Sequence, residues 1–436
     1  KAGIEVLRNE DDVRRAFQMM NRVNNTVHNV KADAFDAWRL FQLVFVVSNL
    51  PSIVTRDPDP RFDAYESQYD DMAEVLWFPT GGGKTEAYLG LVLFNLFFDR
   101  MRGKSRGVTA WIRFPLRLLS RQQKQRFMEA MLEADELRRA PKDEGGLDGR
   151  GREFSLGYFV GSQDSPNDIG KNNRLHEDFR ASHETLEDKC KHLEECPLCG
   201  SDVRVEYEEN ENTVYHTCSG SDLNNGEECI DRIPIYVTDH DIYRYQPSVL
   251  LGSLDKIAVT GMQPLFANLL GNFTTQCPDH GIGYSGRCPE KHICDYDDDS
   301  EEFIDMEPGT RDPDQREDVE FFDPVPTLHL VDEVHLLNEE LGAFASHYET
   351  MYLTLCERLY GVTPKVLTST ATVAEYERQI RNLFQMEATR FPEEGPELGE
   401  TFYGELSETE VEREYHGLTP NNRTHLYAVL DLIKQY

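Results

Sequence analysis

The sequence predicts an α/β protein built around a parallel β-sheet. Short apolar segments alternate with helical patterns along the chain, a glycine-rich loop joins one such segment to a helix, and polar runs directly follow others. Parallel strands need crossover connections, usually helices, and polar residues at strand ends are typical of binding sites in such sheets. We find no internal repeat.

The N-terminal segment, residues 1–37, is predicted to be mainly helical because Val13, Phe17 and Met20 recur at helical spacing. A second, more apolar helix follows over residues 38–50 and ends in a proline-marked loop. The predicted strands are short apolar segments that lead into glycine, proline or polar residues. They cover residues 74–78, 108–114, 155–160, 327–331 and 365–368, with helices over 86–98 and 120–137 after the first two.

Composition and charge argue against two classes of protein. No apolar segment reaches the roughly 18 residues of a membrane-spanning helix, and no signal peptide opens the chain. The formal net charge of −34 argues against a basic protein that coats nucleic acid, and an ordinary solvated acidic surface is the plain explanation of it. We therefore expect a soluble, cytoplasmic protein without a membrane partner and, since the chain starts at Lys1, a fragment of a longer one.

The loop at residues 80–85 (TGGGKT) lies between a predicted strand and a predicted helix, as a phosphate-binding loop does. Glycines let backbone N–H groups approach phosphate oxygens, and the positive end of the following helix points at the same anion. Lys84 would reach the β/γ-phosphates of ATP, and Thr85 would ligate Mg²⁺. The loop residues predicted to bind the nucleotide are Thr80, Gly81, Gly82, Gly83, Lys84 and Thr85. A glycine-rich turn that binds nothing is the alternative, since bulky Phe78 stands where this pattern has a small residue.

Asp332 and Glu333 directly follow the apolar strand at residues 327–331. Asp332 would hold Mg²⁺, and Glu333 would orient and polarise the attacking water. Together with Lys84, they are the predicted catalytic residues. An acidic turn is the alternative in a chain with 79 acidic residues, but the glycine loop upstream favours a nucleotide site.

Eight of the nine cysteines fall between Cys190 and Cys294, and this clustering indicates metal sites in a chain expected to be cytoplasmic. The spacing Cys-x₂-Cys-x₁₈-Cys-x₁₀-Cys fits a Cys₄ zinc ribbon, and a redox dithiol is the alternative. The predicted Zn²⁺ ligands of this first cluster are Cys196, Cys199, Cys218 and Cys229.

A second candidate zinc site has a Cys₃His composition. Its predicted ligands are Cys277, His280, Cys288 and Cys294. The alternative is a loop of unpaired thiols with His280 or His292 exposed, and Cys190 and Cys356 are predicted to be unliganded. Four protein ligands leave no position for a substrate, so both sites would be structural.

With Gly-Lys-Thr, Asp-Glu-Val-His and Ser-Thr-Ala-Thr in this order, the chain resembles superfamily 2 helicases of the DExH kind. The resemblance implies a first RecA-like lobe of a motor that hydrolyses ATP between two lobes while it tracks a nucleic-acid strand. It implies nucleic-acid contacts by Pro115, Arg117, Gln123, Ser253 and Lys256. It implies coupling of the ATP and DNA sites by His335, Ser369, Thr370, Ala371 and Thr372, and adenine recognition by Arg39 and Gln42.

The sequences of residues 77–89 (WFPTGGGKTEAYL) and 159–167 (FVGSQDSPN) resemble those of the large helicase subunit of DISARM, an anti-phage defence system. This implies a partner subunit and action on invading DNA, as a single strand or a duplex with an overhang. An ATP-gated DNA clamp that does not unwind, and the motor subunit of a restriction enzyme, are the alternatives.

The segment after Thr372 is too short for a second lobe, which would supply an arginine finger worth about 10³–10⁵ in rate, so we expect this chain alone to hydrolyse ATP weakly. The interpretation divides the chain into regions of distinct roles. These are a helical N-terminal segment (1–37), three parts of the first lobe (38–185, 237–273 and 324–395), a zinc-binding insertion (186–236), a second cysteine cluster with an acidic linker (274–323), and a linker toward a second lobe (396–436).

Overall fold

A computed structural model describes residues 1–29, 37–78, 82–115, 117–161, 164–167, 169, 183–220, 229–254, 256–257, 263–273, 275–283, 287–296, 304–305, 323–337, 339–371, 375–395, 401–404 and 427. At residues 28–29, 117–119, 121–122, 183, 275, 304–305 and 339 it describes the backbone alone. The chain forms two units, Lys1–Phe391 and Pro392–Tyr436. In the second unit, Thr401 and Gly404 exchange backbone hydrogen bonds across a tight turn.

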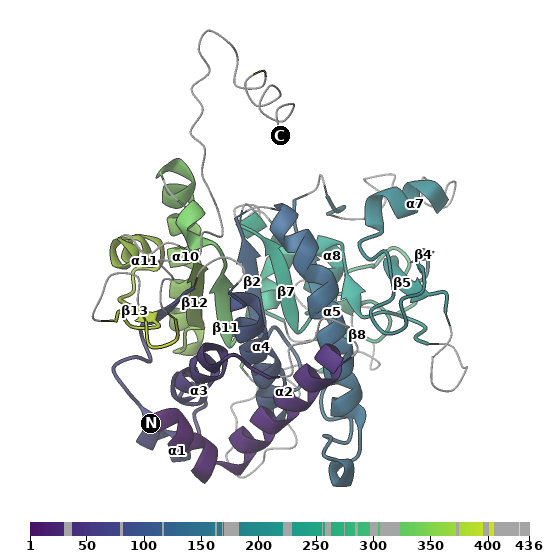
Figure 1. Ribbon diagram of the computed structural model, residues 1–436. Coiled ribbons are helices and arrows are strands. Elements are labelled where there is room, and N and C mark those ends of the chain that lie inside the picture. The colour runs from purple at the N-terminus through teal and green to yellow at the C-terminus, as the bar shows by residue number, and fades with distance from the viewer. Residues whose placement is uncertain are drawn as a thin grey trace. The chain divides into compact units, whose positions relative to one another are not determined.

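Eight parallel strands form the central sheet of the first unit, in the order β13-β1-β12-β11-β2-β7-β3-β6 (Figure 1). They cover Ala73–Trp77 (β1), Ala110–Phe114 (β2), Leu156–Phe159 (β3), Ile235–Tyr236 (β6), Val249–Ser253 (β7), Leu328–Val331 (β11), Lys365–Thr370 (β12) and Ala388–Phe391 (β13). Five of them, β2, β3, β7, β11 and β12, are buried along their whole length. Burial on both faces is typical of a parallel sheet that helices cover on each side.

Helices cover both faces of this sheet. On one face, Ser120 of α5 meets Tyr158 of β3, with their hydroxyls 3.2 Å apart. On the other face, Trp111 of β2 lies in a core to which α8, α10 and α11 contribute. The helices are α4 (Lys84–Met101) and α5 (Arg117–Arg139) on the first face, and α8 (Asp239–Tyr245), α10 (Glu339–Tyr360) and α11 (Tyr376–Phe384) on the second. A parallel sheet between two helical layers is the RecA-like architecture, and the predicted fold class is confirmed.

Three N-terminal helices, α1 (Ala2–Asn9), α2 (Asp11–Asn29) and α3 (Leu40–Val54), pack outside this core, with α2 against α4 and α5 (Figure 1). Helix α3 continues through Pro51, where the sequence predicts its end. Pro51 has no N–H, so the carbonyl of Val47 lacks its helical donor. Helix α1 approaches at this point through Gly3, where an added Cβ would lie 1.8 Å from the Val47 oxygen. Glycine therefore permits the contact that keeps the interrupted helix packed.

The cysteine region forms smaller elements beside the sheet. They are α7 (His183–Cys190), the antiparallel hairpin β4 (Val203–Glu208) and β5 (Thr213–Cys218), and a three-stranded sheet of β8 (Thr275–Cys277), β9 (Gly281–Ile282) and β10 (Ile304–Asp305). Short 3₁₀ helices occur at Pro60–Tyr65 (η1), Lys142–Glu144 (η2), Pro264–Leu270 (η3) and Val334–Leu336 (η4). None of the helices within the described ranges combines the length and apolarity needed to cross a membrane.

Candidate nucleotide and metal sites

The glycine-rich loop links the end of β1 to the start of α4, as a phosphate loop does. Thr80 and Gly81 lie outside the described residues. Gly83 adopts a left-handed backbone with φ +91°, and an added Cβ would lie 2.6 Å from Nε2 of Gln42. Glycine meets both requirements, because it has no Cβ to strain the left-handed conformation or to clash. The loop therefore turns sharply into the helix at Lys84.

Lys84 is largely buried at the first turn of α4. Its ammonium donates a hydrogen bond to the carbonyl oxygen of Phe78 at 2.8 Å. It lies near enough to Glu333 to oppose the rise in the pKa of that carboxyl group. Among the described residues, the side chain is thus held inside the loop by one neutral acceptor, which a phosphate oxygen can replace.

Arg39 and Gln42, the predicted adenine contacts, lie against the same loop from the start of α3. Nε2 of Gln42 donates to the carbonyl oxygen of Gly83 at 2.9 Å, and its Oε1 accepts from the Arg39 N–H at 2.9 Å. Arg39 donates to the carbonyl oxygen of Gly82 at 2.6 Å. Both side chains therefore bond the loop backbone in this structure, and their role in adenine recognition stays a prediction.

The acidic pair lies at the carboxyl end of β11, two strands from β1 in the sheet. Asp332 continues the strand by donating its N–H to the Arg113 carbonyl, and its Oδ1 accepts from the Glu333 N–H at 2.9 Å. Glu333 adopts φ +49°, which is uncommon for a residue with a side chain. Burial, and then the neighbouring Asp332 charge, raise the pKa of Glu333, while Lys84 and His335 oppose the rise.

Tyr88 joins the first turn after the glycine-rich loop to the acidic pair, and it is not among the residues predicted from the sequence. Its hydroxyl lies 3.3 Å from Oγ1 of Thr85 and 3.1 Å from Oδ2 of Asp332. Thr85 and Tyr88 share a helix face because they are three residues apart. That spacing is a sequence signal for the first contact, whereas the contact with Asp332 depends on how β11 lies beside the helix.

The predicted coupling motif packs against the same site. Nδ1 of His335 lies 3.1 Å from Oγ1 of Thr370 and 3.3 Å from Oε2 of Glu333. The indole N–H of Trp77 donates to the Ala371 carbonyl at 3.1 Å. Ser369 is buried, and its hydroxyl has no hydrogen-bond partner within the described ranges; Thr372 lies outside them. The structure thus brings His335 and Thr370 together beside Glu333.

Two of the predicted nucleic-acid segments follow neighbouring strands. The Leu254 N–H donates to the Phe114 carbonyl, so the ends of β2 and β7 lie together. Pro115 is half-buried after β2, while Ser253 is buried at the end of β7 with no partner for its hydroxyl among the described side chains. Arg117 begins α5, with only its backbone described. Gln123 lies half-buried one turn and a half further along α5.

Lys256, the fifth predicted nucleic-acid residue, is buried instead of projecting from the surface. Its ammonium lies 2.5 Å from Oδ2 of Asp239 on α8 and donates to Oδ1 of Asn167 at 3.1 Å. Burial raises the pKa of Asp239 to about 6, with Lys256 opposing the rise. In this structure Lys256 therefore ties the loop after β7 to α8, and a phosphate contact by it stays a prediction.

The first cysteine cluster brings its four predicted ligands together. The sulfur atoms of Cys196, Cys199, Cys218 and Cys229 all lie within 4.8 Å of one another. The Cys199 and Cys218 sulfurs are 3.4 Å apart, and those of Cys196 and Cys229 are 3.9 Å apart. Zn–S bonds of about 2.3 Å place tetrahedral sulfurs about 3.8 Å apart, so these spacings suit such an ion. The cluster can hold a tetrahedral metal ion.

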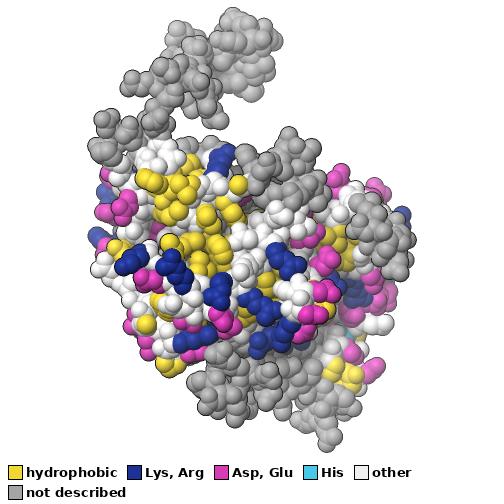
Figure 2. Space-filling view, turned by 60° about the horizontal axis from the view of Figure 1, so that its bottom comes forward, with side chains coloured by type: hydrophobic (Ala, Val, Ile, Leu, Met, Phe, Trp, Pro, Cys, Tyr) yellow, Lys and Arg dark blue, Asp and Glu magenta, His cyan; other side chains and the backbone are white. Residues whose placement is uncertain are grey.

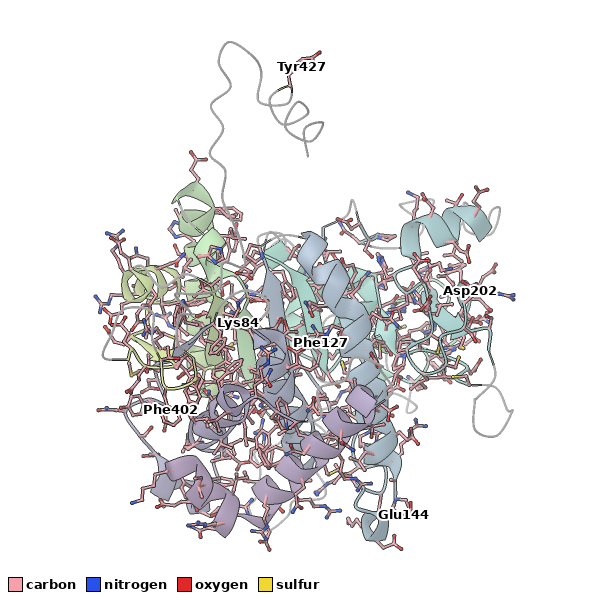
Figure 3. All side chains as sticks on the ribbon, in the orientation of Figure 1. Lys84, Phe127, Glu144, Asp202, Phe402 and Tyr427 are labelled. Carbon is pink, nitrogen blue, oxygen red and sulfur yellow. The ribbon has the colours of Figure 1, made fainter. Side chains whose placement is uncertain are left out.

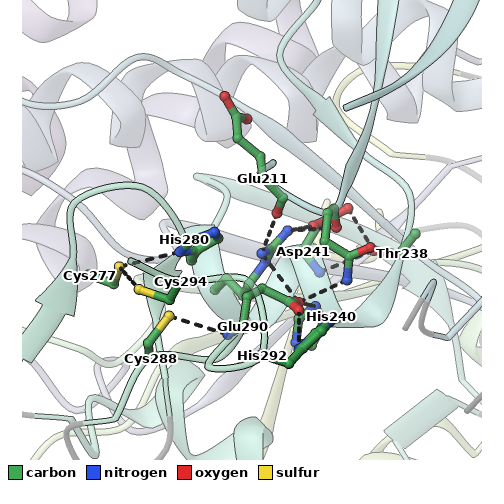
Figure 4. A network of polar contacts seen from close by, with 12 residues as sticks. Glu211, Thr238, His240, Asp241, Cys277, His280, Cys288, Glu290, His292 and Cys294 are labelled. Carbon is green, nitrogen blue, oxygen red and sulfur yellow. Dashed lines mark hydrogen bonds and ion pairs between the residues drawn. The ribbon is translucent and has the colours of Figure 1, made fainter. Parts of the chain in front are cut away.

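The second cluster also assembles. Sγ of Cys277 lies 3.5 Å from Nδ1 of His280 and 3.8 Å from Sγ of Cys294, and the four ligand atoms, including that of Cys288, lie within 4.8 Å (Figure 4). Nε2 of His280 lies 2.8 Å from the carbonyl oxygen of Asn210. That oxygen only accepts, so the ring proton is on Nε2 and Nδ1 faces the sulfurs. A histidine held in this way is typical of metal sites.

Glu290 connects the second cluster to helix α8 (Figure 4). Its N–H donates to Sγ of Cys288 at 3.3 Å. Its buried carboxylate accepts from Nδ2 of Asn212 at 3.0 Å and lies 3.3 Å from His240 and 3.6 Å from Arg244. One carboxylate thus holds the hairpin turn after β4 and the first turns of α8 beside the cysteines.

Three other side chains of this region lie apart from the two clusters. His292 contacts the Glu290 carboxylate at 3.5 Å and is not among the second group of ligands. Cys190 and Cys356 are buried outside both groups.

Lys and Arg side chains gather on the face that carries α1 and α2 (Figure 2), although the chain is strongly acidic. A hollow of about 310 Å³ lies there. It is lined by Asp11, Arg14, Arg15, Gln18, Met19, Arg22, Lys142 and Gly145. Arg15 and Arg22 donate to the carbonyl oxygens of Gly146 and Glu144, which are neutral acceptors. Because α5 runs back from the carboxyl edge of the sheet, this hollow lies away from Lys84, as the Lys84 and Glu144 labels show in Figure 3.

Comparison with known proteins finds no family model that matches the chain. The chain is 30% identical to the DISARM protein DrmA of Bacillus paralicheniformis over 438 residues, which is 92% of this chain and 36% of that relative. It thus spans well under half of that relative's length. Among solved structures, it is similar to the DUF1998 helicase MrfA bound to DNA (TM-score 0.38, 12% identity, 84% of this chain and 29% of that chain). It is also similar to Mss116p bound to ssRNA and AMP-PNP (TM-score 0.32, 11% identity, 80% and 42%).

Proposed function

We propose, from the premise that this chain is a relative of the DISARM protein DrmA over 92% of its own length, that it forms the first ATP-binding lobe of a nucleic-acid-dependent ATPase of the superfamily 2 helicase type. One observation carries the proposal. The loop lysine Lys84 and the acidic pair Asp332–Glu333, far apart in the sequence, meet at the carboxyl edge of one parallel sheet. Phosphate-bearing ligands bind at this edge in α/β proteins.

The residues of this site have distinct chemical tasks in the proposal. Lys84 exchanges the Phe78 carbonyl for the β/γ-phosphates, whose charge it neutralises. Glu333 orients the attacking water and accepts its proton. His335 contacts both Glu333 and Thr370, so a change at the coupling motif reaches the residue that orients the water.

The donor atoms of Thr85 and Asp332 suit Mg²⁺, because hydroxyl and carboxylate oxygens are the hard ligands that this ion takes. Both lie within hydrogen-bond distance of Tyr88 Oη and so close to one another. Mg²⁺ bound there would neutralise charge on the β- and γ-phosphate oxygens. Thr85 and Asp332 would hold it, and Lys84 would bind the phosphates beside it.

The two cysteine clusters are proposed as structural Zn²⁺ sites. Three observations support this: the sulfur spacing, the Nδ1 of His280 turned toward the thiols, and backbone N–H groups that donate to Cys218, Cys288 and Cys294. Such donors stabilise thiolates, the form that binds zinc. Each set has four protein ligands, so neither leaves a position for substrate chemistry.

The relationship to DrmA supports a role in anti-phage defence. We propose that the full-length protein is a cytoplasmic motor that acts on invading DNA together with another subunit. Pro115, Arg117, Gln123, Ser253 and Lys256 are proposed to form its strand path on this lobe. An ATP-gated DNA clamp would need the same nucleotide site, so strand displacement separates it from a helicase.

ATP hydrolysis by the full-length protein, with and without single-stranded DNA, tests the proposal. Lys84→Ala is expected to lower ATP turnover by at least about 100-fold, because the cation for the transferring phosphate is lost. Lys142→Ala is the matched control, since Lys142 lies on an exposed 3₁₀ turn and pairs with Asp148 at 3.5 Å. Unchanged turnover in Lys84→Ala, or a wild-type ATPase that ignores nucleic acid, would overturn the assignment.

A further inference from the structure

We propose that Tyr88 is a positioning residue that sets the hydrogen-bond directions of the two predicted Mg²⁺ ligands, Thr85 and Asp332. The inference rests on the proposed function, because it concerns the same nucleotide site. It assigns a task to a residue that neither the glycine loop nor the acidic pair contains.

The position of the Tyr88 hydroxyl is fixed by the fold. Tyr88 is one turn into α4, and its side chain is almost completely buried. Its ring stacks near Phe127 of α5, with centroids 6.4 Å apart and an interplanar angle of 23°. The hydroxyl consequently points between the first turn of α4 and the end of β11, where it meets Thr85 at 3.3 Å and Asp332 at 3.1 Å.

The chemistry of the three groups determines which one donates. A carboxylate only accepts hydrogen bonds, and burial, followed by the neighbouring Asp332 charge, raises the pKa of Tyr88 above its usual value, so its hydroxyl has one proton at neutral pH. The Tyr88 hydroxyl is the donor toward both Oδ2 of Asp332 at 3.1 Å and Oγ1 of Thr85 at 3.3 Å, and its single proton favours the shorter contact with the charged acceptor. One hydroxyl thus holds one side of the Thr85 oxygen and one side of the Asp332 carboxylate. It also leaves Oδ1 of Asp332, whose partner among the described residues is the Glu333 N–H, as the oxygen open to a cation.

The hydrogen bonds of Tyr88 to Thr85 and Asp332 affect cation binding and nucleotide binding differently. Lys84 and the loop backbone meet the phosphates without Tyr88, whereas Thr85 and Asp332 meet the cation. Without the tyrosine hydroxyl, Thr85 is free to rotate and Asp332 loses a donor that holds its carboxylate plane. The expected loss is therefore in Mg²⁺ affinity, while nucleotide affinity in the absence of Mg²⁺ stays the same.

Tyr88→Phe tests this, because it keeps the ring against Phe127 and removes the hydroxyl alone. The control is Tyr158→Phe, which removes another buried hydroxyl, one that contacts Ser120 of α5 at 3.2 Å. We would titrate Mg²⁺ while the binding of a fluorescent ATP analogue to the full-length protein is measured, and record Mn²⁺ binding by electron paramagnetic resonance. We expect the metal concentration at half-saturation to be about 10-fold higher in Tyr88→Phe for either ion. This is the lower end of the effect of removing the hydrogen-bond partner of a metal ligand. Tyr158→Phe should match the wild type.

Two outcomes would overturn the inference. One is an unchanged metal requirement in Tyr88→Phe. The other is a loss of analogue binding without metal, which would mean that the hydroxyl only supports the fold of the loop. A wild-type protein whose analogue binding shows no response to Mg²⁺ would instead overturn the proposed function, so the two failures are distinguishable.

Discussion

Glu333 has an uncommon backbone conformation for a glutamate, and this is the residue-scale feature that most directly indicates chemistry. Its φ of +49° costs about 1 kcal/mol relative to an ordinary helical or extended backbone. The turn directs its carboxylate to His335 at 3.3 Å and brings it under the influence of Lys84. Residues held in such conformations cluster at functional sites. The strain here therefore agrees with a carboxylate positioned for a task.

Glu333→Gln is expected to bind ATP with wild-type affinity and to hydrolyse it at least about 100-fold more slowly, because an amide cannot accept the proton of water. Turnover at saturating ATP and the affinity for a non-hydrolysable analogue measure the two effects. Glu375→Gln is the control, since Glu375 also has a positive φ but pairs with Arg378 on the exposed side of α11. A Glu333→Gln variant that binds ATP poorly but hydrolyses it normally at saturation would contradict the assigned role.

Glu74, the second residue of β1, leads to a prediction about stability and pH. Burial raises its pKa to about 7, with Lys365 opposing the rise, whereas the value in an unfolded chain is about 4.3. Between these two values the unfolded state ionises while the folded state stays protonated, so stability falls as the pH rises. Glu74→Gln should thus raise the free energy of unfolding by up to about 3.5 kcal/mol at pH 8.

The difference between Glu74→Gln and the wild type should shrink as the pH falls from 7 toward 5. Urea unfolding at both ends of this range measures it. If Glu74→Gln is less stable than the wild type at pH 8, the attraction between Glu74 and Lys365 outweighs the cost of burying the charge.

At the scale of elements, the second cysteine cluster and α8 form one unit. Glu290 links Cys288 to Arg244 and His240 of α8, and Asp239 at the start of the same helix pairs with Lys256. Helix α8 has only seven residues, too few to be stable by itself. Its position between β6 and β7 therefore depends on the contacts around the cluster.

We expect one to two zinc ions per chain in protein purified without chelator, measured by elemental analysis. Cys294→Ser should lose one ion, and hydrogen exchange should speed up in α8 while the amides of α4 keep their protection. Cys356→Ala is the control, because this buried thiol belongs to neither cluster. Absence of zinc in the wild type would refute both sites, and full zinc content in Cys294→Ser would refute the second.

At the scale of the whole molecule, a net charge of −34 repels nucleic acid, so binding must rely on local contacts. The Debye length of about 8 Å at physiological salt screens most of the distant acidic groups. Phosphate contacts give affinity without sequence preference. The predicted contacts lie after neighbouring strands, so the strand path of this lobe would cross the carboxyl ends of β2 and β7.

Arg117→Ala is expected to weaken DNA binding equally for all sequences and to lower the salt-dependence slope by about one for each phosphate that the arginine neutralises. ATP affinity without DNA should stay unchanged. Arg378→Ala, which removes an exposed arginine paired with Glu375, is the control. Fluorescence anisotropy over a range of salt concentrations measures the effect. A wild-type affinity and slope in Arg117→Ala would place the strand path elsewhere.

The sequence by itself determined the features that depend on local spacing. The glycine loop before a helix, the acidic pair after a strand and the spacing of the cysteines are each encoded within a few residues, because backbone geometry and ligand chemistry require them there. Five of the eight strands were also predictable from short apolar segments, and the parallel class followed from their alternation with helices.

The tertiary structure decided what depends on contacts between distant segments. Strand order places β12 between β1 and β11, and that arrangement brings Thr370 to His335. The packing of α8 and α4 on the sheet likewise brings Lys256 to Asp239 and the Tyr88 hydroxyl to Asp332. No local pattern specifies these contacts, because they result from how the strands pair and how the helices pack on the sheet. Three strands, β6, β7 and β13, were missed. For the short strands β6 and β13 the reason is the same, since their pairing with longer neighbours stabilises them more than their own sequence does.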